Sequence, residues 1–229
     1  MITLTIIAKD EEVGIKRCIE SALPFVDEII VGIDSKSTDR TKEIAQEYTQ
    51  KVYDFDWEDD FAKPRNMLIE KASNDWILVL DAHEYITGWE LPDFDKKFDA
   101  YRMQIFMEDN SSIWTDRLIR KDIRYVNPIH TIPAVKTYKK IDIKIKHDRN
   151  TMNKEARDAR NKQREEMIFK HLGDKGDPRS LFYLAQQHHD SGNWSAAMIV
   201  FAKYLRYKTF QEERSRAFKM INDCLEKLK

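Results

Sequence analysis

The order of apolar and helical segments in the first 81 residues restricts the chain to few folds. Four apolar runs lie at residues 2–8, 26–34, 51–57 and 75–81. Three segments with helical character separate them, at about residues 13–22, 35–48 and 59–72. The resulting order β-α-β-α-β-α-β predicts an α/β sheet, flanked by helices, whose first strands are parallel.

The pattern changes twice further along the chain. Between residues 99 and 147, stretches such as "DAYRMQIFM" and "KTYKKIDIKIKH" predict further strands, some of them antiparallel. From Thr151 a polar helix is expected, then two helices separated by "DSGN" and a last helix, which is typical of one tetratricopeptide unit with an extension. We therefore expect one domain at 1–150 and a helical domain at 151–229. A single such unit is too small for a stable solenoid, so we expect it to pack on the first domain.

Composition narrows the functional classes. With 39 Lys and Arg against 40 Asp and Glu, the formal net charge of the 229 residues is -1, so no bulk field favours nucleic acid or membranes. Cys18 and Cys224 show no metal-ligand spacing, and a reducing cytoplasm fits them. The sequence shows no signal peptide and no transmembrane segment, and we expect a cytoplasmic protein.

Acidic residues stand where two predicted strands end. Asp34 ends one apolar run and Asp81 ends another, and in an open α/β sheet both ends face the same crevice. Each aspartate alone is as readily a cap for the helix or turn that follows. Two further acids, Asp39 and Asp60, lie in the intervening loops. Four acids in this region favour a chemical site over helix or turn capping.

The turn "DAHE" predicts a metal site. Asp81 and His83 are two residues apart, so in an extended segment their side chains lie on the same side and can bind one divalent ion. A carboxylate with an imidazole suits Mn²⁺ better than Mg²⁺, although Mg²⁺ stays an alternative. His130 and His147 each follow a strand-like stretch and are candidates for further ligands. The other histidines fall in the helical part, where we expect surface or packing roles.

Arginines offer anion-binding groups. Arg65 in "FAKPRN" stands at the start of a helix, where a guanidinium and a helix N-terminus can both meet a phosphate. Arg117, Arg120 and Arg124 have spacings that suit the solvent face of a strand equally well. The sequence lacks the glycine loops of P-loop NTPases and dinucleotide oxidoreductases and the nucleophile elbow of α/β-hydrolases.

Together these stretches resemble a known family. "TLTIIAKDEEVGIKRCIESALPFVDEIIVGIDSKSTDRTKEIAQEY", "VYDFDWEDDFAKPRNMLIEKASNDWILVLDAHE" and "DRLIRKDIRYVNPIH" look like family 2 glycosyltransferases with the GT-A fold. More narrowly, the chain resembles small bacterial and phage members with a tetratricopeptide-like C-terminal extension. The resemblance covers nearly the whole chain and is most specific over the first 90 residues.

The resemblance implies roles for individual residues. The aspartate that holds uridine corresponds to Asp34, and the metal motif Asp-x-Asp corresponds to Asp81-Ala82-His83, similar to the Asp-x-His version of polypeptide N-acetylgalactosaminyltransferases. The family's later Ile-His-Glu appears as Ile129-His130-Thr131, without the glutamate. The residues implied to line the nucleotide-sugar pocket are Ala8, Lys9, Glu11, Asp34, Asp39, Asp60, Arg65 and Ala82.

The implied reaction is transfer of a hexose from a UDP-sugar to an acceptor hydroxyl, with inversion of configuration. The ion neutralises charge on the leaving UDP, and a carboxylate takes the acceptor's proton. Asp116 and Glu84 are the candidates for this base. The acceptor stays open between a glycan, a lipid-linked sugar, a protein and a modified base in phage DNA, for which "KTYKKIDIKIKHDR" offers a local basic face.

Three other readings compete with an active transferase. The His83 and Thr131 departures suit a protein of this fold that binds a nucleotide sugar or a partner without turnover. A nucleotidyltransferase has similar paired acids, but "AKDEEVGIKR" is too acidic for its phosphate loop. A tetratricopeptide adaptor needs more than one repeat.

Overall fold

The computed structural model describes residues 1–88, 93–107, 111–129, 131–148, 162, 166–168, 178–207 and 211–229. The chain divides into two compact units, Met1–Asn153 and Lys154–Lys229. The predicted boundary at residue 150 and most of the polar helix expected after it lie outside the described residues and stay predictions. None of the described helices is long and apolar enough to cross a membrane.

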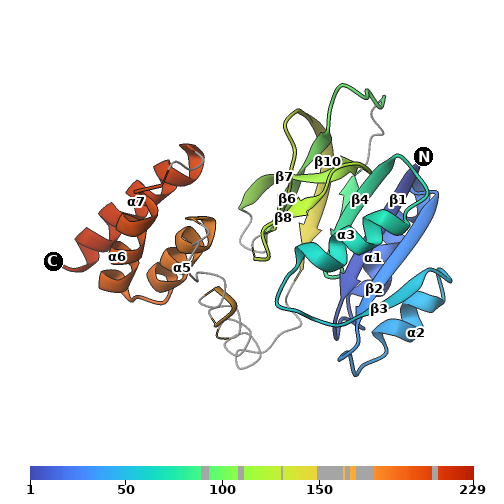
Figure 1. Ribbon diagram of the computed structural model, residues 1–229, viewed down its shortest axis with the longest axis horizontal. Helices are drawn as coiled ribbons and strands as arrows, with labels where there is room; N and C mark the ends of the chain where they lie inside the picture. The colour runs from blue at the N-terminus through green and yellow to red at the C-terminus, as the bar shows by residue number, and fades with distance from the viewer. Residues whose placement is uncertain are drawn as a thin grey trace. The chain divides into compact units, whose positions relative to one another are not determined.

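An eight-stranded mixed sheet organises the first unit, in the order β3-β2-β1-β4-β7-β6-β10-β5 (Figure 1). The parallel pairs are β1–β2, β1–β4, β2–β3 and β6–β10, and the antiparallel pairs are β4–β7, β6–β7 and β5–β10. The predicted α/β sheet with parallel first strands and later antiparallel strands is confirmed. Its strands are β1 Ile2–Ala8, β2 Glu28–Asp34, β3 Val52–Phe55, β4 Trp76–Asp81, β5 Glu84–Gly88, β6 Ala100–Phe106, β7 Ser112–Arg120 and β10 Tyr138–His147; β8 Tyr125–Val126 and β9 Ile132–Pro133 form a separate pair.

Alternation along the strands explains how helices cover both faces of this sheet. Leu4 and Ile6 of β1 point to the face where α1 (Ile15–Ala22) packs, whereas Ile77 and Val79 of β4 point to the face of α3 (Ala62–Lys71). A 3₁₀ turn, Leu23–Phe25, follows α1, and α2 (Thr41–Gln46) packs on β2 and β3. The strands between the helices are therefore buried on both faces, as their continuous apolar runs predict.

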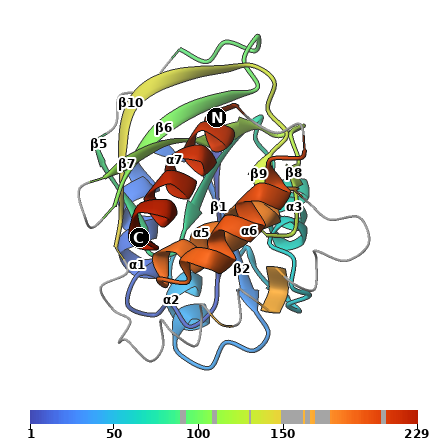
Figure 2. The same cartoon turned by 90° about the vertical axis from the view of Figure 1, so that its left-hand side faces the viewer.

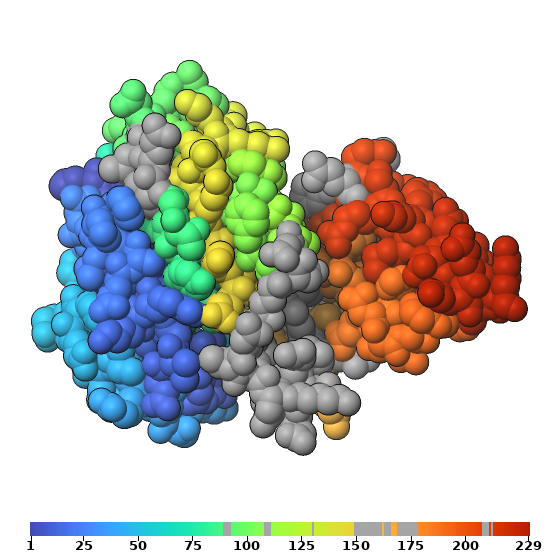
Figure 3. Space-filling model, turned by 180° about the vertical axis from the view of Figure 1, so that it is seen from behind, coloured from blue at the N-terminus to red at the C-terminus, as the bar shows by residue number. Residues whose placement is uncertain are grey.

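The sheet curls because two residues join strands that are far apart in it. Only Ala82 and His83 lie between β4 and β5, which occupy the fourth and eighth positions of the sheet. The strands between them must therefore bend round until β5 returns to the end of β4. Figure 3 shows β5 (green) beside its partner β10 (yellow). The curl brings the carboxyl ends of β4 and β10 and the start of β5 together.

The second unit contains α5 (Pro178–Asp190), α6 (Trp194–Tyr204) and α7 (Gln211–Lys227), which pack on one another (Figure 2). Phe182, Phe201 and Tyr204 fill the core between them. A short turn containing Gly192 separates α5 from α6, as expected for a helical hairpin. The likeness to a tetratricopeptide unit stays a prediction.

Glu28, at the start of β2, ties together segments that are distant in sequence. Its carboxylate accepts hydrogen bonds from the Thr3 hydroxyl and from Ser73, and it pairs with Lys51. Burial alone would raise the pKa of Glu28, but these donors lower that pKa from 4.5 to about 2. The ionised carboxylate is therefore favoured in the folded state.

We expect Glu28→Gln to lower the free energy of unfolding at pH 7 by about 1–3 kcal/mol. Because the pKa of Glu28 is lower in the folded state, the decrease in the free energy of unfolding has its full size above about pH 4.5. It becomes smaller as the pH falls toward 2. Urea unfolding at pH 7 and pH 3 measures it, with the exposed Glu47→Gln as control. A loss of equal size at both pH values would contradict the assignment.

Candidate functional site

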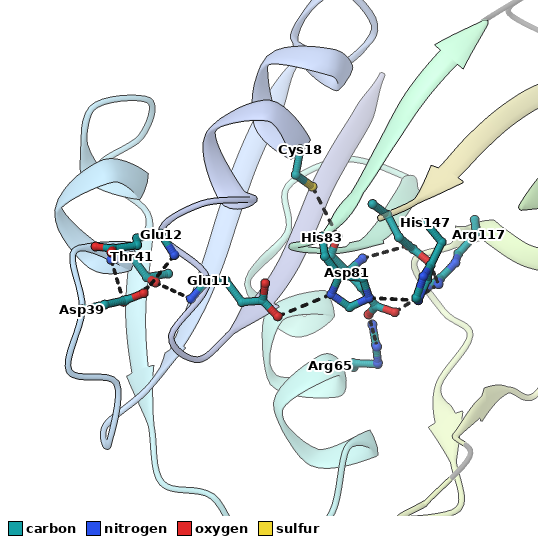
Figure 4. Close-up of polar contacts among 11 residues, drawn as sticks. Glu11, Glu12, Cys18, Asp39, Thr41, Arg65, Asp81, His83, Arg117 and His147 are labelled. Carbon is teal, nitrogen blue, oxygen red and sulfur yellow. Dashed lines mark hydrogen bonds and ion pairs between the residues drawn. The ribbon is translucent and has the colours of Figure 1, made fainter. Parts of the chain in front are cut away.

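The carboxylate of Asp81, at the carboxyl end of β4, faces two guanidinium groups (Figure 4). Nη2 of Arg65 donates to its Oδ1 at 2.6 Å, and Nη2 of Arg117 donates to its Oδ2 at 3.2 Å. Burial alone would raise the pKa of Asp81, but the two positive charges outweigh it and hold the pKa well below its usual range. Asp81 is therefore a stable anion inside the site.

A β-bulge directs Arg117 toward this carboxylate. The two residues that flank Arg117 on β7 pair with consecutive residues of β6, so Arg117 is an extra residue in the ladder. Such an extra residue interrupts the alternation of side chains and re-aims one of them. The same Nη2 also donates to Oε1 of Glu84, at 2.5 Å, so one guanidinium bridges two carboxylates.

Glu84, the first residue of β5, is part of the same network of hydrogen bonds and ion pairs. Its side chain is 1 % exposed, and its Oε2 accepts a hydrogen bond from the backbone N–H of Asp81 at 3.0 Å. Burial raises the pKa of Glu84, although Arg117 opposes that rise. Both carboxylate oxygens are engaged in joining β5 to β4 and β7. The predicted role of Glu84 as a base stays a prediction.

The arginine pair has spare hydrogen-bonding capacity. Nε and Nη1 of Arg65 and Nε of Arg117 are buried and have no acceptor among the described residues. Buried donors are normally paired, and an ionised donor gains most from an anionic acceptor. The site is therefore suited to oxygens of an anionic ligand, with guanidinium forks that match phosphate geometry.

His83 lies between Glu11 and His147 (Figure 4). Its Nδ1 is 3.4 Å from Oε1 of Glu11, and its Nε2 is 3.1 Å from Nε2 of His147. A carboxylate beside Nδ1 favours the tautomer with its proton there, which leaves the lone pair of Nε2 directed at His147.

His83 and His147 are the two imidazoles that the structure brings together at this edge. The 3.1 Å between their Nε2 atoms is the length of an ordinary hydrogen bond between two imidazoles, and both nitrogens are of the type that could hold an ion. Asp81 instead faces two cations. Among the described residues, no three His, Cys, Asp or Glu side chains form a metal-binding group. The shared Asp81–His83 ion stays a prediction, and His130 lies outside the described residues.

The carboxyl ends of β1 and β2 bring further predicted residues to the same edge. β1 lies between β2 and β4, so Asp34 and Asp81 end the strands on either side of it. Asp34 is 4 % exposed, and its Oδ1 accepts the N–H of Lys36 at 2.9 Å. Ala8 ends β1 and is buried, whereas Lys9 is exposed.

Hydrogen bonds connect the loop that follows β1 to the loop that follows β2. Oδ2 of Asp39 accepts the backbone N–H of Glu12 at 2.9 Å, and the backbone N–H of Glu11 donates to Oγ1 of Thr41 at 2.7 Å (Figure 4). Burial alone would raise the pKa of Asp39, but the Thr41 hydroxyl and backbone donors lower it. Asp39 therefore orders these loops, and its contact with a nucleotide stays a prediction.

Residues at the start of α3 position Arg65. Oδ1 of Asp60 accepts the backbone N–H groups of Ala62 and Lys63, at 2.8 and 3.3 Å, which caps the first turn of the helix. Asn66 then exchanges two hydrogen bonds with the backbone of Tyr125, at 2.8 and 3.0 Å. Asp60 thus has a structural contact here, and its predicted contact with the donor stays a prediction.

Asp116, the second candidate base, lies on β7 beside the bulge. Its two oxygens accept hydrogen bonds from Nε and Nη2 of Arg102 on β6, at 2.8 and 3.2 Å. The side chain is 13 % exposed, so it is less enclosed than Glu84. The pairing holds Asp116 in one orientation, and its catalytic role stays a prediction.

Gly14 allows α1 to approach the turn that carries Ala82. A Cβ at position 14 would stand 2.8 Å from the carbonyl oxygen of Ala82 and 3.3 Å from Cα of His83. Both contacts are with backbone, so a side chain would push the helix away from the turn. Ala82 itself is buried, and any contact of its backbone with a ligand stays a prediction.

Arg117 is the main residue of this cluster that sequence reasoning did not select. Its spacing from Arg120 and Arg124 is equally typical of a solvent-exposed strand. The available signal is the polar pair Asp116–Arg117 followed by the apolar pair Leu118–Ile119, because strict alternation along one strand gives neither pair. The structure brings together Glu11, Arg65, Asp81, His83, Glu84, Arg117 and His147.

Comparisons with known proteins agree with this architecture. The sequence model described as Glycosyl transferase family 2 matches residues 3–150. A TPR repeat-containing protein of Synechococcus elongatus is 37% identical over 141 residues, which cover 57% of this chain and 35% of that protein. The SPbeta prophage-derived glycosyltransferase SunS of Bacillus subtilis is 39% identical over 83 residues, covering 35% of this chain and 19% of SunS. The chain thus spans about a third or less of these relatives.

Among solved structures, the crystal structure of S. aureus TarS 1-349 is similar to this chain, with a TM-score of 0.48 and 14% sequence identity. The match covers 99% of this chain and 80% of that chain. A complex of the same TarS fragment with UDP-GlcNAc has a TM-score of 0.48 and 13% identity, and covers 100% of this chain and 81% of that one.

We expect Arg117→Met to lower the free energy of unfolding by about 3–5 kcal/mol, because it leaves buried carboxylates without their shared cation. Arg40→Met, at an exposed residue just before α2, is the matched control and should cost less than about 1 kcal/mol. Urea unfolding measures both. Equal, small losses in the two variants would contradict a structural role for the bridge.

Proposed function

We propose that this chain, which belongs to glycosyl transferase family 2, transfers a hexose from a UDP-sugar to an acceptor hydroxyl. The observation that carries the proposal is the edge where β1, β2 and β4 end. There the buried arginines, Arg65 and Arg117, have N–H groups in need of acceptors. Diphosphate oxygens are suitable acceptors, and the strand ends beside them are where α/β sheets bind nucleotides.

The donor would extend from the β1–β2 loops toward the turn after β4. We assign the uridine to Asp34 and to the loop of Glu11, by resemblance to the family. Asp39 orders the loops that follow β1 and β2 before the donor binds, so these loops lose little conformational entropy on binding. Arg65 and Arg117 would meet the diphosphate, whose charge grows as UDP leaves, and their positions are already set by Asp81 and Glu84.

A divalent ion, Mn²⁺ or Mg²⁺, would be held by His83 and His147, with Glu11 orienting His83 from the opposite ring nitrogen. When bound, the ion supplies positive charge next to the leaving group. Two imidazole nitrogens favour Mn²⁺ over Mg²⁺. Asp81 serves in this assignment to position the arginines.

Asp116 is our preferred base for the acceptor hydroxyl. It is less enclosed than Glu84, whose oxygens both bind the β4–β5–β7 junction. Arg102 holds the Asp116 carboxylate from one edge and fixes its direction. Inversion of configuration follows from the family resemblance and requires attack from the side opposite the leaving UDP.

A panel of UDP-sugars with and without Mn²⁺ tests the proposal. We expect at least one UDP-sugar to raise the melting temperature and to be hydrolysed slowly, because a ligand bound to the native state stabilises it by mass action. His83→Ala should weaken binding of Mn²⁺ itself, followed by calorimetry, by about tenfold or more. His188→Ala in the helical unit is the matched control.

The outcomes separate the alternatives. Stabilisation by a UDP-sugar with no release of UDP above background would favour the non-catalytic binding protein. Full Mn²⁺ affinity in His83→Ala would contradict the ion assignment alone. No stabilisation by any UDP-sugar would contradict the donor site.

A further inference from the structure

The β6–β7 hairpin extends beyond the edge that carries the donor site. The β4–β7 ladder ends where Leu78 pairs with Leu118, whereas residues 112–116 of β7 continue past it in register with β6. At about 3.4 Å per residue, Trp114 stands about 10 Å along the strand from Arg117. This extension therefore lies within a few sugar lengths of the proposed reaction centre.

The outer side of the extension is polar, cationic and aromatic. Along β10 the isoleucines at 141, 143 and 145 are buried, and the residues between them are exposed. In the register of the sheet, the exposed Lys140 and Lys144 of β10 pair with Arg102 and Gln104 of β6. Those two residues pair in turn with Asp116 and Trp114 of β7. We name this surface the outer patch; it comprises Arg102, Gln104, Trp114, Lys140, Lys144 and Lys146.

The helices of the first unit pack elsewhere. The main contacts of α1 are with β5, and those of α3 are with β1, β2 and β8. Trp114 in the outer patch is 39% exposed, and Nζ of Lys140 lies 4.8 Å from the centre of its ring system. Lys140 thus places a cation over one face of the indole, and the ring adds a large, flat apolar surface to the patch.

The patch has an excess of positive charge, although the chain as a whole has a net charge of -1. Asp116 is balanced by Arg102, and Asp142, which also faces outward on β10, lies 3.8 Å from Lys144. Lys140 and Lys146 have no carboxylate partner among the ion pairs of the described residues. The field of the outer patch therefore favours an anionic partner.

We propose that the outer patch binds the acceptor and that the acceptor is an anionic glycan chain. A pyranose ring can stack its C–H groups on the face of Trp114 opposite Lys140, while the acidic groups of neighbouring sugars pair with Lys140 and Lys146. The inference rests on the proposed function, because it selects one acceptor class for that transferase. It also gives the lysine-rich strand β10 a specific role at the reaction edge.

Two oligosaccharides of equal length, heptagalacturonate and maltoheptaose, test charge and stacking separately. We expect the acidic heptamer to bind the full chain more tightly than the neutral one, and its affinity to fall as salt rises. Trp114→Ala and the double variant Lys140→Glu with Lys146→Glu should each weaken it by about tenfold or more. Tyr207→Ala and Lys96→Glu remove exposed residues elsewhere and serve as matched controls.

UDP-sugar hydrolysis without an acceptor is measured on the same variants. We expect it to be unchanged within about twofold, since none of the substituted side chains contacts the donor site. A wild-type chain that binds neither heptamer, that binds both equally, or whose affinity is unaffected by the patch variants would overturn the proposal while leaving donor hydrolysis intact. Loss of donor hydrolysis in the wild type would contradict the proposed function instead.

Discussion

One guanidinium group, that of Arg117, ties β5, the last strand of the curled sheet, to the carboxyl end of β4. It joins Asp81 at the end of β4 to Glu84 at the start of β5, which lie four positions apart in the sheet but three residues apart in the chain. Buried charges of this kind are costly unless each is paired. The two-residue turn, the bulge on β7 and the position of Arg65 are all consistent with that requirement.

The parts of this architecture that depend on local patterns were predictable. Apolar runs that end in Asp34 and Asp81 indicated parallel strands with acids at one edge, and the helix start at Arg65 was read from its flanking residues. Arg117 was not selected, because a bulge depends on the register of two paired strands and leaves little trace in the residues of one. The contact of His83 with His147 depends on β10 lying beside β5, a long-range pairing that alternation does not specify.

Two of the predicted ligand contacts have structural partners in the folded chain. The sequence predicts Asp39 and Asp60 as ligand contacts, and in the folded chain both also accept hydrogen bonds from backbone N–H groups, of the loops and of α3 respectively. Such residues hold the framework in which Arg65 and His83 are positioned before a ligand arrives. Preorganisation of charge in this way is the main means by which a protein stabilises a leaving diphosphate. A site assembled from strand ends thus has rigid groups where the chemistry needs them.

The most direct test of the donor site is hydrogen–deuterium exchange of the full chain with and without UDP in the presence of Mn²⁺. We expect slower exchange in peptides covering residues 8–12, 34–41 and 81–84, with β10 near His147 also protected. Exchange in α5 and α6 should be unchanged. Protection confined to other segments, or none at saturating UDP, would contradict the claim that the carboxyl edge of β1, β2 and β4 binds the nucleotide.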